Sequence, residues 1–265
     1  MNTTHTWILL RGLIRGCFHW HEFPSKFAAA RPLDHVICID LPGNGARFNE
    51  QTPWSIEAMA DDLWQKIQLE TQRIQHTQPD DHHHVHLLSI SMGAMIAAEL
   101  AQRHPNDFAS LHMINTSFAN YNPPWQRMRL NAMGSLVANL LGVERRERAI
   151  LRWTSNQPDI QRYVAPWVAE ARQHPLTFRN ALAQLLAAAR YQAPKTAPCA
   201  VTRIYYSEND RLVSADCSRS IAKGWNVISH CHPSAGHDLP LDEPEWLLTH
   251  ILDERAQPTT GVKEG

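Results

Sequence analysis

Short runs of apolar and β-branched residues alternate along this chain with segments whose apolar residues recur at helical spacing. Strand-like runs occur at 7–10, 35–40, 85–90, 110–117, 199–207 and 225–231. Helical patterns occupy 20–30, 55–72, 92–104, 181–191, 214–224 and 243–252. Strands that alternate with helices form βαβ units, in which consecutive strands run parallel. The pattern therefore predicts a doubly wound, mostly parallel α/β sheet.

The alternation stops in the segment 118–198, which contains no convincing strand and is rich in arginine and tryptophan, including Trp125, Trp153 and Trp167. We interpret it as a helical cap inserted over the carboxyl edge of the sheet. The final residues, RAQPTTGVKEG, contain almost no apolar side chains and are expected to form a flexible tail. The predicted organisation is a core of 1–117 and 199–254, a cap of 118–198 and a tail of 255–265.

Composition argues against several classes of partner and location. The 265 residues carry a formal net charge of -1, so nothing indicates a nucleic acid or an anionic membrane as partner. The apolar runs are too short to span a bilayer, and the first residues lack the features of a signal peptide. The five cysteines are widely spaced and odd in number, which is typical of free thiols in a reducing cytoplasm. We expect a cytoplasmic protein without membrane insertion; its oligomeric state is unknown from the sequence.

The stretch LLSISMGAM (87–95) delivers a serine from a strand-like run into the first turn of a helix. A turn this tight requires small residues two positions before and after the serine, and Ser89 and Gly93 meet that requirement. The helix that begins at Met92 would direct its N-terminal dipole at Ser91, which favours a developing oxyanion. Ser91 is therefore the candidate nucleophile, although a plain strand-to-helix turn would show the same pattern.

A nucleophilic serine needs a base and a group that orients the base. In the chain order Ser…Asp…His, Asp210 follows the run 199–207 and His237 follows the next strand-like run. Three other carboxylates are weaker candidates for the acid. Asp40 precedes the serine, Asp216 lies within a helical pattern, and Asp238 is adjacent to His237 and cannot readily reach the same imidazole.

These motifs resemble the α/β-hydrolase superfamily, in particular its capped esterase, haloperoxidase-like and C–C hydrolase branch. The similar segments are WILLRG, HVICIDLPGNG, SMG, NDRLV and AGHDLPLDEP. The resemblance covers nearly the whole chain and implies an oxyanion hole made by the backbone N–H groups of Leu13 and Met92. Relatives usually begin with a β-hairpin, but only six residues precede Trp7 here. The hairpin should therefore be absent, which leaves about six strands.

The turn after the first strand departs from this resemblance, because Arg11 stands where relatives carry the histidine of an HG pair. Arg11 could bind an anionic substrate group, or it could be a structural cation paired with a carboxylate such as Asp40; we favour the structural role. Arg15 lies further along the turn and is the better candidate for substrate contact. Trp125 of the predicted cap is a further candidate, facing an apolar acyl group.

The resemblance and the candidate residues together favour a serine hydrolase that transfers an acyl group from an ester or thioester to water. Cleavage of an amide or a C–C bond is an alternative chemistry, and a non-catalytic ligand receptor or scaffold is an alternative class. The substrate would be a small molecule, with no cofactor and no metal. The histidine-rich DDHHHVH (80–86) resembles a metal cluster, but it precedes a strand, and a solvated loop is the preferred interpretation.

Overall fold

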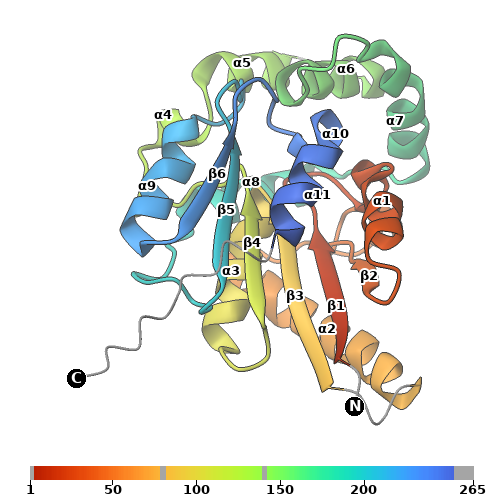
Figure 1. Cartoon of the computed structure of the whole chain (residues 1–265). Helices are drawn as coiled ribbons and strands as arrows, with labels where there is room; N and C mark the ends of the chain where they lie inside the picture. Colours follow the sequence, from red (N-terminus) through yellow and green to blue (C-terminus); the bar gives the residue numbers. More distant parts are fainter. Residues whose placement is uncertain (1–2, 78–81, 139–141, 254–265) are drawn as a thin grey trace.

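The computed structural model describes residues 3–77, 82–138 and 142–253, which form a six-stranded sheet with helices on both faces (Figure 1). All strand pairs are parallel, in the order β2-β1-β3-β4-β5-β6, so the predicted doubly wound parallel sheet is confirmed. The strands are β1 (Thr3–Leu10), β2 (His35–Cys38), β3 (His82–Ile90), β4 (Ser110–Ile114), β5 (Thr202–Ser207) and β6 (Ile228–His232). Parallel strands place their carboxyl ends at one edge, where α/β folds bind ligands.

Two layers of helices cover the sheet, because successive side chains of a strand point to opposite faces. Ile8 and Leu10 pack in one apolar core with α2 (Ile56–Thr77), α3 (Met92–Arg103) and α9 (Ala215–Trp225). Trp7 and Leu9 pack in the other with α1 (Phe23–Ala30) and α11 (Pro244–Leu252). The remaining short elements of this part of the chain are η1 (Cys17–Trp20), η2 (Gly45–Arg47) and α10 (Leu239–Asp242).

Helices also occupy the segment that lacked strand patterns. Between β4 and β5 lie α4 (Pro124–Arg127), α5 (Leu130–Ala138), α6 (Val143–Thr154), α7 (Gln161–Gln173) and α8 (Phe178–Arg190). The ribbons of α5, α6 and α7 cross above the carboxyl ends of the strands (Figure 1). α6, α7 and α10 share a small apolar cluster that includes Leu151, Trp167 and Leu241. These inserted helices are therefore tied to the core at the edge where the strands end.

Several element boundaries differ from the prediction. The segment 82–84 is not a loop, because β1 begins at Thr3 and pairs Thr3 with His82, which extends β3. Residue 225 ends α9 instead of opening a strand, because Asn226 adopts the left-handed conformation that closes the helix. The predicted helix 20–30 is interrupted at His21, which has a φ of 51°.

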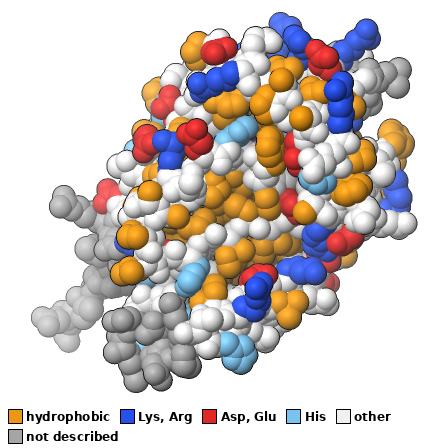
Figure 2. All heavy atoms as spheres, turned by 90° about the vertical axis from the view of Figure 1, so that its right-hand side faces the viewer, with side chains coloured by type: hydrophobic (Ala, Val, Ile, Leu, Met, Phe, Trp, Pro, Cys, Tyr) orange, Lys and Arg blue, Asp and Glu red, His pale blue; other side chains and the backbone are white. Residues whose placement is uncertain are grey.

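The surface mixes both signs of charge, in keeping with the net charge of -1. Figure 2 shows the side that carries α1 and α7, where hydrophobic side chains gather in the middle and charged side chains surround them. The predicted tail, 255–265, and two residues of the histidine-rich stretch, Asp80 and Asp81, lie outside the described residues. Within 3–77, 82–138 and 142–253, no helix combines the length and the apolar character needed to cross a membrane.

Candidate active site

Ser91 lies at a strained turn between β3 and α3. Its φ of 58° and ψ of -122° are unusual for a residue with a side chain. Glycine is required at position 93, because a Cβ there would lie 2.5 Å from the Arg11 carbonyl oxygen and 2.6 Å from that of Leu10. Ser89, the small residue two positions before Ser91, is accommodated, since its side chain is fully buried and donates to the His112 carbonyl oxygen at 3.2 Å. The local sequence therefore forms a sharp elbow that presents Ser91.

The two backbone N–H groups predicted to form an oxyanion hole lie next to the elbow. Met92 is the first residue of α3, so its N–H has no acceptor one turn earlier in the helix. Leu13 lies in the turn after β1 and lines the same cavity as Ser91. Gly12 permits the close approach of this turn, because a Cβ on it would lie 2.9 Å from the Ser91 Cβ. The two predicted oxyanion donors thus lie on the two segments that meet at Ser91.

His237 and Asp210 form a buried pair after β6 and β5. His237 Nδ1 lies 2.7 Å from Asp210 Oδ2, and the two residues are 5% and 2% exposed. The other carboxylate oxygen of Asp210 accepts the N–H groups of Leu212 at 2.8 Å and Val213 at 2.9 Å. These bonds hold the carboxylate toward the imidazole. With Nδ1–H donated to Asp210, Nε2 is left as an acceptor.

The rejected carboxylates have other partners. Asp40 accepts the N–H groups of Cys17 at 2.6 Å and Ala46 at 2.9 Å, so it shapes the loops after β1 and β2. Asp216 lies on α9 and pairs with Arg219 at 2.9 Å. Of the four carboxylates considered from the sequence, Asp210 is the one that faces the His237 ring.

The loop that carries His237 is anchored from two sides. Asn115, at the end of β4, donates to the His237 carbonyl oxygen at 2.8 Å and accepts the Ser207 N–H at 2.9 Å. Asp242 accepts the N–H of Gly236 at 2.7 Å and the hydroxyl of Ser155 at 2.6 Å. Burial raises the pKa of Asp242, although these hydrogen bonds act in the opposite direction. The imidazole position therefore depends on β4, β5 and the end of α6.

Arg11 forms a two-pronged ion pair with Asp238. Its two terminal nitrogens donate to the two carboxylate oxygens at 3.0 Å and 2.6 Å, and its guanidinium lies 5.1 Å from the centre of the Trp20 ring. The suggested partner Asp40 was therefore wrong, because the turn directs Arg11 toward the His237 loop. Burial raises the pKa of Asp238, but the charge and hydrogen bonds of Arg11 outweigh burial and lower it overall.

Arg15 is also buried, and it contacts the inserted helices. One terminal nitrogen donates to Glu147 of α6 at 2.7 Å and to His19 Nε2 at 3.0 Å. The guanidinium also lies 4.7 Å from the Trp167 ring of α7. Burial lowers the pKa of Arg15, although the charge of Glu147 opposes this effect. Arg15 thus joins the turn after β1 to α6 and α7.

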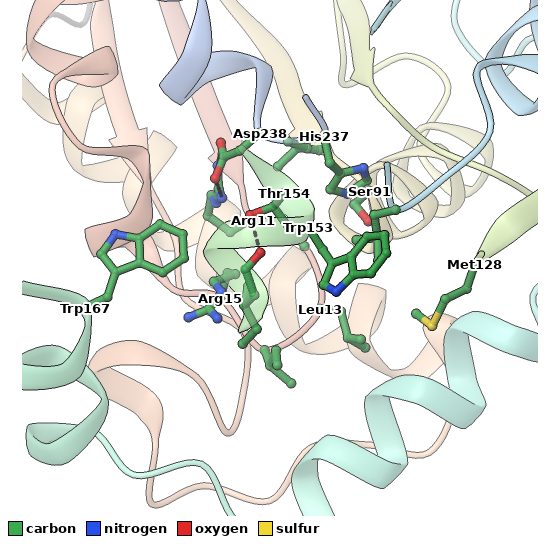
Figure 3. Close-up of a pocket in the computed structure, with 15 residues that line it drawn as sticks. Arg11, Leu13, Arg15, Ser91, Met128, Trp153, Thr154, Trp167, His237 and Asp238 are labelled. Carbon is green, nitrogen blue, oxygen red and sulfur yellow. Dashed lines mark hydrogen bonds and ion pairs between the residues drawn. The ribbon is translucent and has the colours of Figure 1, made fainter. Parts of the chain in front are cut away.

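These residues surround a small cavity (Figure 3). Its volume of about 70 Å³ is well below the roughly 300–1,000 Å³ of drug-sized ligand sites. Trp125 lies elsewhere: it is 64% exposed and lines a broader depression beside Asn209 and Asp210. The lining of the small cavity combines donors with apolar side chains and comprises Arg11, Gly12, Leu13, Ile14, Arg15, Ile90, Ser91, Met128, Ile150, Trp153, Thr154, Trp167, Leu212, His237 and Asp238.

Comparison with known families agrees with this geometry. The model of the family described as the alpha/beta hydrolase family matches residues 8–249. The chain belongs to the alpha/beta hydrolase family. No curated protein matches it closely enough to be a relative.

Solved structures share the fold of this alpha/beta hydrolase at low sequence identity. An esterase from Exiguobacterium antarcticum has a TM-score of 0.73 and 12% identity, covering 95% of this chain and 91% of that chain. A protein described as a non-heme bromoperoxidase from Mycobacterium tuberculosis has a TM-score of 0.69 and 20% identity, covering 95% and 92%. The RedJ thioesterase of the prodiginine pathway in Streptomyces coelicolor has a TM-score of 0.63 and 16% identity, covering 95% and 92%.

One feature of this alpha/beta hydrolase, the anchor of the turn after β1, was missed by sequence reasoning. Ile14 adopts a φ of 53°, and its N–H donates to the side-chain oxygen of Gln184 at 2.7 Å. Gln184 lies on α8, is fully buried, and donates to Asn44 at 2.8 Å. Asn44 in turn donates to the Arg15 carbonyl oxygen at 3.1 Å. No local pattern links Gln184 to a turn 170 residues away.

The histidine-rich stretch lies far from these residues in the fold. His82, His83 and His84 form the first part of β3, whereas Ser91 follows its last residue. In the part of the chain that the structure describes, no group of three or more His, Cys, Asp or Glu side chains is arranged to hold a metal ion. The five cysteines are all free thiols.

Proposed function

We propose that this protein is a serine hydrolase that transfers the acyl group of an ester or thioester to water, with Ser91, His237 and Asp210 as its catalytic triad. The observation that carries the proposal is the buried 2.7 Å contact between His237 Nδ1 and Asp210 Oδ2. His237 also lines the same cavity as Ser91 at the elbow. The esterase and thioesterase among the structural neighbours support this bond type.

In this mechanism, Nε2 of His237 takes the proton of Ser91 as Oγ attacks the substrate carbonyl. Asp210 holds the imidazole in the required tautomer and stabilises its cation. The N–H groups of Leu13 and Met92 stabilise the tetrahedral oxyanion. The leaving alcohol or thiol takes the proton from His237, and water activated by the same base then hydrolyses the acyl-enzyme.

The arginine at position 11 is compatible with this chemistry. The predicted donor in the turn is the backbone N–H of Leu13, which does not depend on the side chain at position 11. Arg11 is neutralised by Asp238, next to His237 in the chain, and so joins the turn after β1 to the histidine loop. Its role in this proposal is to position these two segments.

The helices α4–α8 act in this proposal as a cap over the triad. Side chains of α6 and α7, including Trp153 and Trp167, line the cavity. Because the cavity is only about 70 Å³, the cap limits the bound acyl group to a short one. Trp125 points to the broader depression, where it would contact the alcohol or thiol portion of the substrate.

A fluorophosphonate probe tests the proposal, because it labels an activated serine. We expect stoichiometric labelling of the wild type, and no labelling or ester turnover in a folded Ser91→Ala variant. The matched control is Ser89→Ala, which removes a buried hydroxyl two residues away and should still be labelled. Labelling that persists in Ser91→Ala would refute the assignment of the nucleophile.

A further inference from the structure

Three residues that line the cavity beside Ser91 each carry a buried N–H donor without an acceptor. Among the described residues, eight buried side-chain nitrogen or oxygen atoms have no hydrogen-bond partner. Three of them, Arg11 Nε, Arg15 Nη2 and Trp153 Nε1, belong to residues that line this cavity. All three are donors, and a buried donor without a partner costs about 1–3 kcal/mol. A ligand that supplied acceptors would remove this cost.

The charge next to Arg15 is unbalanced. Glu147 is 1% exposed and accepts from two arginines, Arg15 at 2.7 Å and Arg146 at 3.0 Å. One carboxylate therefore serves two guanidinium groups, whereas Arg11 has Asp238 to itself. Arg146 is partly exposed to solvent, so Arg15 is the buried cation of this cluster that an added anion would stabilise. A second carboxylate at Arg15 would give two cations and two anions.

The rest of the lining restricts what can carry that anion. Leu13, Ile90, Met128 and Leu212 surround the space next to Ser91 with apolar groups. A ligand in this cavity would meet apolar groups beside Ser91 and polar donors at Arg15 and Trp153. Figure 3 shows Arg15, Trp153 and Ser91 around this one cavity. The small volume of about 70 Å³ favours a short chain between the scissile carbonyl and the anion.

We propose that the acyl group of the substrate carries a second, terminal carboxylate, so that the substrate is a monoester or monothioester of a short dicarboxylic acid. This inference rests on the proposed function for the position of the scissile carbonyl. Arg15 Nη2 and Trp153 Nε1 donate to the distal carboxylate, while Ser91 attacks the ester carbonyl. Hydrolysis then yields the free dicarboxylic acid and the alcohol or thiol.

Three methyl esters of equal heavy-atom count test the inference. Monomethyl succinate carries the carboxylate, methyl succinamate carries a neutral amide, and methyl 4-methylpentanoate carries an isopropyl group. We expect the wild type to prefer the carboxylate over the hydrocarbon by about tenfold to a hundredfold in kcat/KM, the range of one charged hydrogen bond. Equal kcat/KM values for all three would overturn the inference, as would an amide hydrolysed as well as the carboxylate.

Two variants locate the preference. Trp153→Phe removes one donor and keeps a smaller aromatic ring, and should lower kcat/KM for monomethyl succinate by about threefold to tenfold. Trp20→Phe is the matched control: its indole N–H is also buried without a partner, but Trp20 does not line the cavity. Trp20→Phe should leave the ratio of kcat/KM for monomethyl succinate to kcat/KM for methyl 4-methylpentanoate unchanged. A ratio that falls equally in both variants would contradict the assignment.

Removing Arg15 alone would leave the buried Glu147 with Arg146 as its remaining arginine partner and would change the charge of the cluster, so the informative change is the double variant Arg15→Met, Glu147→Gln. It should lose the carboxylate preference and still hydrolyse the hydrocarbon ester. Calorimetric binding of monomethyl succinate to Ser91→Ala separates the two proposals, because it requires no turnover. Binding of monomethyl succinate without probe labelling of the wild type would support the anion site and refute the hydrolase. Probe labelling of the wild type without a preference for the carboxylate ester would support the hydrolase and refute the anion site.

Discussion

Replacing Gln184 by leucine should slow catalysis from a position on α8 that has no direct contact with the reacting atoms. The Gln184 oxygen accepts the N–H of Ile14 at 2.7 Å, and this bond holds the turn that carries the Leu13 N–H. Its nitrogen donates to Asn44 at 2.8 Å. A leucine of similar size can make neither bond, so both the turn and the 41–52 loop lose an anchor.

The magnitude follows from the groups left without partners. The Ile14 N–H and the Asn44 oxygen each lose a partner, at about 1–3 kcal/mol per group, so the free energy of unfolding should fall by about 2–6 kcal/mol. Removing a whole oxyanion donor costs about 10²–10³ in kcat. A turn that is loosened but not removed should cost about tenfold to a hundredfold, mostly in kcat and little in KM.

The assay compares kcat, KM and fluorophosphonate labelling rate with the urea unfolding curve. Asn180→Leu is the matched control, because Asn180 lies one turn earlier on α8, is 2% exposed, and bonds Thr52 at 3.1 Å and Glu50 at 3.0 Å. It should lose similar stability and keep its kcat. A folded Gln184→Leu with wild-type kcat, or an equal loss of kcat in Asn180→Leu, would refute the reasoning.

Three further outcomes are expected. Asp210→Asn should cost about 10⁴ in kcat through the wrong imidazole tautomer, whereas Asp40→Asn should lower the melting temperature with a much smaller loss of kcat; the opposite result would make Asp40 the acid. Gly93→Ala should lose about 1–3 kcal/mol of stability and react slowly with the fluorophosphonate probe, because its Cβ would lie 2.5 and 2.6 Å from two backbone oxygens. An unchanged rate of probe labelling would show that the elbow tolerates a side chain at position 93. Burial lowers the pKa of His86 to about 3, so its neutral form is favoured in the folded state and stability is lost as pH falls from about 6.5 toward 3. Urea unfolding should therefore show about 2 kcal/mol less stability at pH 5 than at pH 7, and a flatter dependence in His86→Phe.

The order of elements and the placement of the candidate triad could be predicted from the sequence. Alternating runs predict parallel strands, and parallel strands bring their carboxyl ends to one edge of the sheet. Ser91, Asp210 and His237 each follow a strand-like run, so their convergence follows from topology alone. Local sterics also explain the elbow, since the requirement for a small residue at position 93 is a property of a few consecutive residues.

Element ends were less predictable, because pairing and backbone conformation override local composition. The polar residues at 82–84 are a strand only because β1 extends to meet them. Asn226 ends α9 by adopting the left-handed conformation, although Trp225 and the residues after it form a strand-like run in the sequence.

Only the tertiary structure decided the partners of the buried charges and amides. Arg11 meets Asp238, Arg15 meets Glu147, and Ile14 meets Gln184, across separations of 227, 132 and 170 residues. Hydrophobic periodicity determines which face of a helix or strand is buried, but it does not determine which polar side chain of another element will lie opposite. That choice depends on how the inserted helices pack over the sheet, and it sets the size, charge and unsatisfied donors of the cavity beside Ser91.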